Sequence, residues 1–220
     1  MIRASLTVAA ALAALGTLGY FAIAVADPSA DKVADEAKKK RAPPPRTPTP
    51  QEVADAKVAW GDVYRVLQSP RCINCHPADG APKQTDNGVP HAMNISRLSA
   101  ESGLACSTCH STKNSEDTIG LAGGPPGALH WGLPPKDTPM VFENHTPTSL
   151  CVQLKDPEHN GKRSLADLVH HVSHDALVLW GWNPGGNRTV PPMSHKAFVA
   201  AMTRWAKGGG ACPEPAVRQP

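Results

Sequence analysis

The chain has 220 residues, a formal net charge of +3 at pH 7, 18 glycines and 23 prolines, but only three phenylalanines and two tyrosines. Its basic residues are scattered, which excludes the concentrated positive surface of a nucleic-acid-binding protein. A sequence so rich in loop-forming residues and so poor in large apolar side chains folds more easily when another group fills part of its interior.

The first 26 residues are typical of an export signal. Met1-Ile2-Arg3 gives a positive start, residues 4–25 are uncharged and rich in Ala and Leu, and Ala24-Val25-Ala26 is a small-residue cleavage site. The apolar run is close to the ~20 residues that span a bilayer, so residues 4–26 are alternatively an uncleaved inner-membrane anchor. We therefore expect a periplasmic protein, either soluble or tethered to the inner membrane.

Residues 27–50, "DPSADKVADEAKKKRAPPPRTPTP", alternate charge runs with proline and carry almost no large apolar side chain. Such a segment buries too little surface to fold, and its proline-rich end is typical of a semi-rigid linker. We therefore place a single folded domain at residues 51–220.

The domain begins with a predicted helix. Thr49-Pro50-Gln51-Glu52 combines a capping residue, a proline at the first helical position and a glutamate three residues after the cap. Apolar residues then recur every three or four positions, as on one face of a helix that ends before Pro70. They are Val53, Ala56, Trp60, Val63 and Leu67.

A five-residue motif follows this helix and occurs twice, as Cys-Ile-Asn-Cys-His at residues 72–76 and Cys-Ser-Thr-Cys-His at residues 106–110. Cysteine pairs with this spacing are typical of a zinc site, a redox-active dithiol or a covalently attached c-type haem. Only haem attachment requires a histidine directly after each pair, since that imidazole reaches the iron while the thiols bond to the porphyrin. We therefore predict two c-type haems, bound through Cys72, Cys75, Cys106 and Cys109, with His76 and His110 as proximal iron ligands.

Each iron then needs a ligand on its other face, and the candidates fall in two places. His91 and Met93 lie in the short segment between the two motifs. His171 and His174 lie about one turn apart in a helix predicted to start at Ser164, on a face without its leucines and valines. We expect at least one distal ligand among these four residues.

The rest of the domain contains long stretches without a sustained period, at residues 77–105 and 111–163, which we expect to be loops that wrap the cofactors. A last helix is predicted from near Ser194, with Phe198, Met202 and Trp205 on its apolar face. The fold class is therefore mostly α: a loop-rich di-haem domain with about three to five helices.

Cys151 and Cys212 lie outside both motifs. In an oxidising compartment, two remaining cysteines are most simply explained by a disulfide bond. The alternative is a cysteine thiolate as an iron ligand. A disulfide between them would join the C-terminus to the middle of the chain.

The domain resembles a family of secreted bacterial di-haem cytochromes c. The resemblance covers most of residues 51–215, through "PRCINCHP", "HAMN", "CSTCH", "LCVQLKDPEHNGKRSLADLVHH", "LWGWNPG" and "GGGACP". It implies an electron carrier. Some members are labelled subunits of isoquinoline-oxidising or aldehyde-oxidising molybdenum hydroxylases, which implies a dehydrogenase as electron donor and a cytochrome or an oxidase as downstream acceptor.

We therefore expect an electron-transfer protein, or the cytochrome subunit of an oxidoreductase, that passes single electrons between such partners. The alternative is a di-haem enzyme or sensor in which one iron has an open position, similar to di-haem peroxidases and to cytochromes that oxidise sulfur compounds. The chain length argues mildly against the peroxidases, which are typically larger two-domain proteins.

Overall fold

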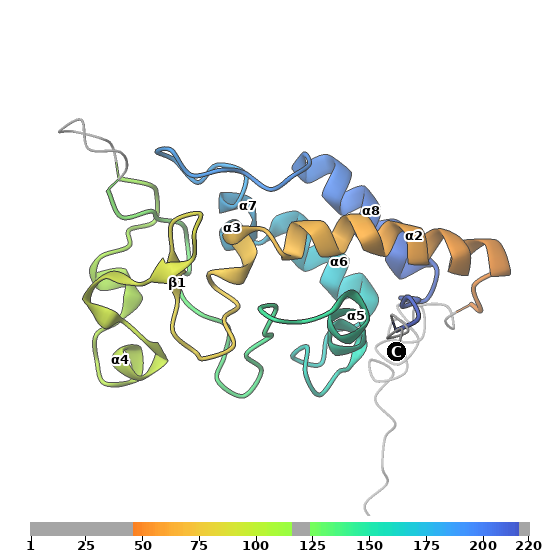
Figure 1. Cartoon of the computed structure of the whole chain (residues 1–220), viewed down its shortest axis with the longest axis horizontal. Helices are drawn as coiled ribbons and strands as arrows, with labels where there is room; N and C mark the ends of the chain where they lie inside the picture. Colours follow the sequence, from red (N-terminus) through yellow and green to blue (C-terminus); the bar gives the residue numbers. More distant parts are fainter. Residues whose placement is uncertain (1–45, 116–123, 216–220) are drawn as a thin grey trace, which may run out of the picture. The chain divides into compact units, whose positions relative to one another are not determined.

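A computed structural model describes residues 46–115 and 124–215 of the chain (Figure 1). These residues belong to a single compact unit that begins at Arg46. The expected signal or anchor at residues 1–26, and residues 27–45 of the expected linker, lie outside the described residues. None of the helices in the described part is long and apolar enough to cross a membrane.

The described residues are mostly helical, which confirms the predicted fold class at that level. They form seven α-helices: α2 (Pro50–Leu67), α3 (Pro70–Ile73), α4 (Arg97–Glu101), α5 (Pro147–Lys155), α6 (Leu165–His174), α7 (Ala176–Trp180) and α8 (His195–Lys207). Two short 3-10 helices are also present, η1 (Ala92–Asn94) and η2 (Cys106–Thr108). One antiparallel pair of two-residue strands, β1 (Lys83–Gln84) and β2 (Val89–Pro90), completes the regular structure of this part.

The predicted number of three to five helices is too low. α3, α4 and α7 have only four or five residues, which is shorter than the window in which a helical period can be recognised. α5 lies in the stretch 111–163 that we expected to be irregular. Its start is nevertheless marked in the sequence, since Thr146-Pro147 repeats the capping residue and first-turn proline of Thr49-Pro50.

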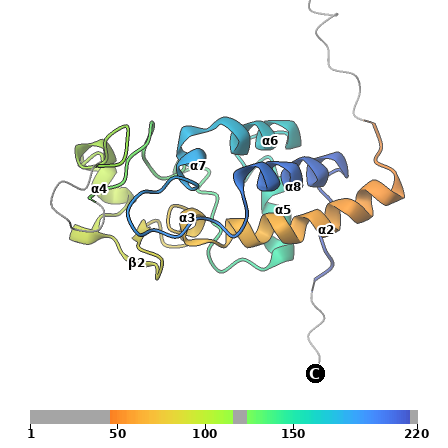
Figure 2. The same ribbon diagram turned by 90° about the horizontal axis from the view of Figure 1, so that it is seen from above.

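The core lies where α2, α5, α6 and α8 meet. α8 packs against α2 (Figures 1 and 2), and the rings of Trp60 and Trp205 meet between them with centroids 5.1 Å apart. Met202 of α8 is buried, as its place on the predicted apolar face requires. The helices approach so closely at one end that a Cβ on Gly208 would lie 2.2 Å from the Glu52 carbonyl oxygen, so only glycine fits there.

One face of α2 holds the loop that leads into α5. Three side-chain donors, spaced four residues apart and therefore on the same side of the helix, bond to backbone carbonyls of residues 142–147. The bonds run from Trp60 Nε1 to Pro147 O (2.8 Å), from Tyr64 Oη to His145 O (2.8 Å) and from Gln68 Nε2 to Phe142 O (3.0 Å). They fix the path of this loop relative to the core.

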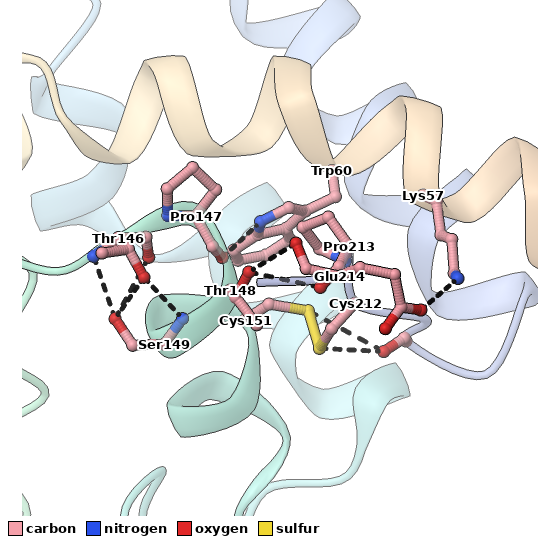
Figure 3. The surroundings of a disulfide bond; sticks show 11 residues. Lys57, Trp60, Thr146, Pro147, Thr148, Ser149, Cys151, Cys212, Pro213 and Glu214 are labelled. Atoms are coloured by element: carbon pink, nitrogen blue, oxygen red, sulfur yellow. Dashed lines mark hydrogen bonds and ion pairs between the residues drawn. A yellow bond between two sulfur atoms is a disulfide. The ribbon is translucent and has the colours of Figure 1, made fainter. Parts of the chain in front are cut away.

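Cys151 and Cys212 are at disulfide distance, with their Cα atoms 5.6 Å apart, as the sequence predicts (Figure 3). Cys151 is fully buried in α5, and Cys212 follows α8. Beside the bond, the Thr148 hydroxyl lies 3.2 Å from the carbonyl oxygens of both Pro213 and Glu214 and donates to them. The segment after α8 is thereby attached to α5.

Replacing Thr49 with Ala is expected to lower the free energy of unfolding by about 1 kcal/mol. The Thr49 hydroxyl accepts a hydrogen bond from the Glu52 amide at 3.2 Å, and the Glu52 carboxylate accepts one from the Thr49 amide at 2.9 Å. Denaturant unfolding measures the difference. Thr203→Ala is the control, because this exposed threonine lies inside α8 and donates to the Val199 carbonyl; an equal loss in both variants would contradict the capping role.

Loss of the disulfide through the paired change Cys151→Ala and Cys212→Ala is expected to cost about 4 kcal/mol of unfolding free energy, because the bond spans a sequence separation of 61. Reduction of the parent protein should produce a similar loss without changing a side chain. Denaturant unfolding with and without reductant compares the two. An unfolding midpoint that neither treatment changes would show that the two cysteines are not bonded.

Candidate functional site

The two Cys-x-x-Cys-His motifs fold into the same backbone turn. In both, the amides of the second cysteine and of the histidine donate to the carbonyl oxygen of the first cysteine. The distances are 3.1 and 3.1 Å in residues 72–76, which continue α3, and 3.2 and 3.0 Å in residues 106–110, which contain η2. Each motif is therefore one helical turn with its histidine at the end.

Each motif histidine is fixed by a hydrogen bond at Nδ1. His76 Nδ1 lies 2.6 Å from the carbonyl oxygen of Met140, and His110 Nδ1 lies 2.6 Å from that of Pro126. A carbonyl oxygen only accepts, so Nδ1 carries the hydrogen and Nε2 keeps its lone pair. This is the arrangement of a histidine that binds a metal through Nε2.

An aromatic ring lies parallel to each of these imidazoles. Phe142 stacks on His76 with ring centroids 3.8 Å apart and planes at 8°. Trp131 stacks on His110 with centroids 4.6 Å apart and planes at 9°. The stacked ring and the carbonyl bond together fix the plane of each imidazole.

Burial lowers the pKa of His76 to about 4, and it also lowers the pKa of His110. The hydrogen bonds to the carbonyl oxygens oppose the shift in both cases, while the neighbouring His91 adds to it at His110. Both imidazoles are consequently neutral at pH 7, which is the form that coordinates a metal.

The motif cysteines are free thiols in this structure. Burial raises the pKa of Cys72 and of Cys75 to about 11, so these thiols stay protonated at neutral pH, unlike the low-pKa cysteines of redox-active dithiols. Within residues 46–115 and 124–215, no group of three or more His, Cys, Asp or Glu side chains is arranged to hold a metal ion. The four cysteines thus do not converge on one tetrahedral zinc site in the described structure.

A cavity of about 830 Å³ opens beside the motifs, within the roughly 300–1,000 Å³ of typical small-molecule and cofactor sites. Both motifs and the segment between them contribute to its wall, through Cys75, His91, Cys106, Cys109 and His110. Trp131 and Trp180 add aromatic surface, with ring centroids 4.8 Å apart. The cavity is therefore suited to a large, mainly apolar ligand.

Among the four distal-ligand candidates, His91 lies next to a motif histidine. Its ring centroid is 5.9 Å from that of His110, and its Nδ1 contacts the Ala92 carbonyl oxygen at 2.8 Å, which leaves Nε2 free. Two imidazoles that bind one metal from opposite sides, through nitrogen–metal bonds of about 2 Å, have ring centres roughly 6 Å apart. Met93 lines the same cavity, but it is 78% exposed.

The structure separates the two candidates on α6. His171 is half-buried, its Nδ1 lies 3.6 Å from the Asp175 carboxylate, and it is close enough to His76 to contribute to the lowered pKa of that residue. His174 is exposed, and its ring stacks on His170 with centroids 4.4 Å apart. Of this pair, His171 is therefore better placed to bind the same metal ion as His76.

Sequence reasoning missed the groups that orient the motif histidines. The acceptors are the backbone carbonyls of Met140 and Pro126. Every residue has such a carbonyl, so the sequence does not show which one accepts the bond. Phe142 and Trp131 did leave a signal, because aromatic residues are scarce in this chain and these two stand in regions that otherwise read as loops. The scarcity of aromatic residues singles out Trp131 in the sequence, but it does not reveal that this ring stacks on His110.

Comparison with known proteins gives no further assignment. The chain matches no protein-family model, no curated protein and no solved structure. The function is therefore argued from the motifs and from the geometry around them.

Glu143 connects the loop after the first motif to the loop that carries Met140. Its carboxylate accepts a hydrogen bond from the Ala78 amide at 2.9 Å and pairs with the Lys83 ammonium group. The Ala78 amide, and then Lys83, hold the pKa of Glu143 below its usual value.

Replacing Glu143 with Gln is expected to lower the free energy of unfolding at pH 7 by about 1 kcal/mol, because the charge-assisted hydrogen bonds are lost. A carboxyl group whose pKa is lowered by folding stabilises the fold above its unfolded pKa of about 4.3, and this contribution disappears as the pH falls through the folded value. The difference between parent and variant should therefore be constant from pH 7 down to about pH 5 and shrink as the pH falls below about 4.3.

Denaturant unfolding across this pH range measures the effect. Glu158→Gln, on the exposed turn after α5, is the control and should cost little at any pH. A penalty for Glu143→Gln that is the same at every pH would contradict the role of the charge.

Proposed function

We propose that this protein is a di-haem c-type cytochrome that passes single electrons between a dehydrogenase and a downstream acceptor. The observation that carries the proposal is the Nδ1 hydrogen bond of His76 and of His110, each to a backbone carbonyl, at the end of a turn that also holds two free thiols. A proximal haem ligand needs this tautomer, and the adjacent thiols are those that bond to the porphyrin.

The residues around the second motif fit a porphyrin. A haem is flat, apolar over its faces and carries two carboxylates, and the cavity beside the second motif offers aromatic and aliphatic walls with a few charged side chains. Cys106 and Cys109 line that cavity beside His110, whose ring is supported by Trp131. When bound, the haems would supply one-electron chemistry, while the chain would hold them and tune their potentials.

The distal positions support a carrier. We assign His91 to the iron held by His110 because of the 5.9 Å between their rings. We propose His171 in preference to His174 for the iron held by His76, because His171 is the half-buried member of the pair and its charge contributes to the lowered pKa of His76. Histidine on both faces closes an iron to small molecules and generally gives a lower potential than methionine does, so two closed irons favour electron transfer over an open-site enzyme or sensor.

A haem bound at the second motif would have the more accessible porphyrin edge. Cys109 is exposed, whereas the thiols of the first motif are half-buried. A porphyrin bonded to Cys109 would therefore have an edge near the surface, where a partner can exchange electrons with it. The donor would be a dehydrogenase, with a molybdenum hydroxylase as the form that the resemblance implies, and the acceptor a cytochrome or an oxidase.

Haem attachment is tested by producing the chain together with the c-type maturation machinery and measuring covalently bound haem by mass and by its pyridine haemochrome spectrum. The parent should carry two haems. The pair Cys72→Ala and Cys75→Ala should carry one, as should the pair Cys106→Ala and Cys109→Ala, while the control pair Cys151→Ala and Cys212→Ala should keep two. A parent without covalent haem would overturn the proposal.

The proposal that each iron has two histidine ligands is tested by paramagnetic resonance and by adding carbon monoxide to the reduced protein. In the parent, both irons should be low-spin, and the gas should leave the spectrum unchanged. His91→Ala should make one iron high-spin and able to bind the gas, whereas Met93→Ala should not; His171→Ala and His174→Ala form the corresponding pair for the other iron. Binding of carbon monoxide by the parent would refute the carrier and favour an enzyme or sensor.

A further inference from the structure

A charged corner forms part of the wall of the cavity beside the motifs. It is lined by Arg71, Arg188 and Asp86. Arg71 Nη2 donates to Asp86 Oδ1 at 2.7 Å, and the Asp86 carboxylate also accepts a hydrogen bond from the Thr189 amide at 3.1 Å. With two cations and one anion, this corner has an excess positive charge.

Arg71 is the more deeply buried of the two cations. Its side chain is 3% exposed, and its guanidinium carbon lies 5.8 Å from the centre of a Trp180 ring. Its Nε is a buried donor without a hydrogen-bond partner in the described part of the chain. Buried donors in native proteins are rarely left unpaired, so this position calls for an acceptor from outside the described chain.

Arg188 is held by the backbone. Its Nη1 donates to the carbonyl oxygens of Pro184 and Gly185 at 3.1 and 3.2 Å, and its Nη2 donates to that of Gly124 at 3.0 Å. These bonds use three of the five N–H groups of a guanidinium. The acceptors are neutral, so they fix the position of Arg188 without compensating its charge.

The positive charge of Arg71 affects the pKa of Arg188. Burial and the neighbouring Arg71 both lower the pKa of Arg188, whereas Asp86 raises it. An arrangement in which two cations repel one another is relieved when an anion binds between them.

We infer that Arg71 and Arg188 bind a carboxylate of the cofactor that occupies this cavity, which under the proposed function is a propionate of a c-type haem. The carboxylate would accept hydrogen bonds from Arg71 Nε and from the remaining donors of Arg188, while Asp86 keeps the Arg71 side chain in place. Guanidinium groups are the preferred protein partners of carboxylates. The identity of the ligand rests on the proposed function, and the binding residues lie outside both Cys-x-x-Cys-His motifs.

This contact would have two effects on a bound haem. It would fix the rotation of the porphyrin in its plane, in addition to the two thioether bonds. It would also place positive charge near the iron, which disfavours the more positive oxidised state and raises the reduction potential.

The test uses the full chain matured with haem and three substitutions. Arg188→Gln removes one charge from the corner, and Arg188→Lys keeps the charge but not the planar fork. Arg65→Gln is the matched control, because Arg65 is an exposed residue of α2 that pairs with Asp62 and does not line the cavity. The measurements are the propionate bending band in the resonance Raman spectrum and the reduction potential of each haem at fixed pH.

In Arg188→Gln, we expect the propionate band of one haem to shift. We also expect the reduction potential of that haem to fall by up to about 59 mV, which corresponds to a tenfold change in its one-electron equilibrium constant. Arg188→Lys should shift the same band with a smaller change in potential, and Arg65→Gln should change neither. A propionate band that is unshifted in both Arg188 variants would overturn the carboxylate site while the cytochrome proposal stands. A parent that carries no haem would overturn the proposed function itself.

Discussion

The hydrogen bond between His76 Nδ1 and the Met140 carbonyl is the constraint around which the described fold is arranged. It brings together two residues that are 64 positions apart in the chain, so the loop that carries the carbonyl needs independent support. The donors of α2 provide it by fixing residues 142–147, and Phe142 in the same loop stacks on the imidazole. The helical core thus positions a loop against a ring, which is how a chain with few large apolar side chains orders a site made mainly of loops.

The two motifs share one local structure but differ in what supports it. The turn, the Nδ1 bond and the parallel aromatic ring recur at His110. Its carbonyl partner, however, belongs to the Pro125-Pro126 segment and not to a loop held by α2. Burial lowers the pKa of His76 to about 4, while Cys109 of the second motif is exposed. For the proposed cytochrome this implies one deeply held haem and one nearer the surface, with unequal access to partners.

The sequence was informative wherever structure depends on residue type and short spacing. The capped helix α2 and the core position of Met202 follow from local patterns, and the pairing of Cys151 with Cys212 follows from their being the two cysteines outside the motifs. The single-turn helices are too short to show a period, and carbonyl acceptors have no residue signature. The preference for His171 over His174 as the proposed distal ligand also depends on the fold, because both lie on the same helix and only their surroundings differ.

The regular spacing of donors along α2 limits how the length of the chain can vary. Trp60, Tyr64 and Gln68 each reach a different carbonyl of the same loop. A one-residue insertion between them would rotate every later donor by about 100° around the helix axis, and an insertion of four residues would leave a rotation of about 40° and displace the donors by about 6 Å along the axis. The number of residues between Trp60 and Gln68 is therefore fixed by these three hydrogen bonds. We expect related chains to keep this number even where their sequences differ.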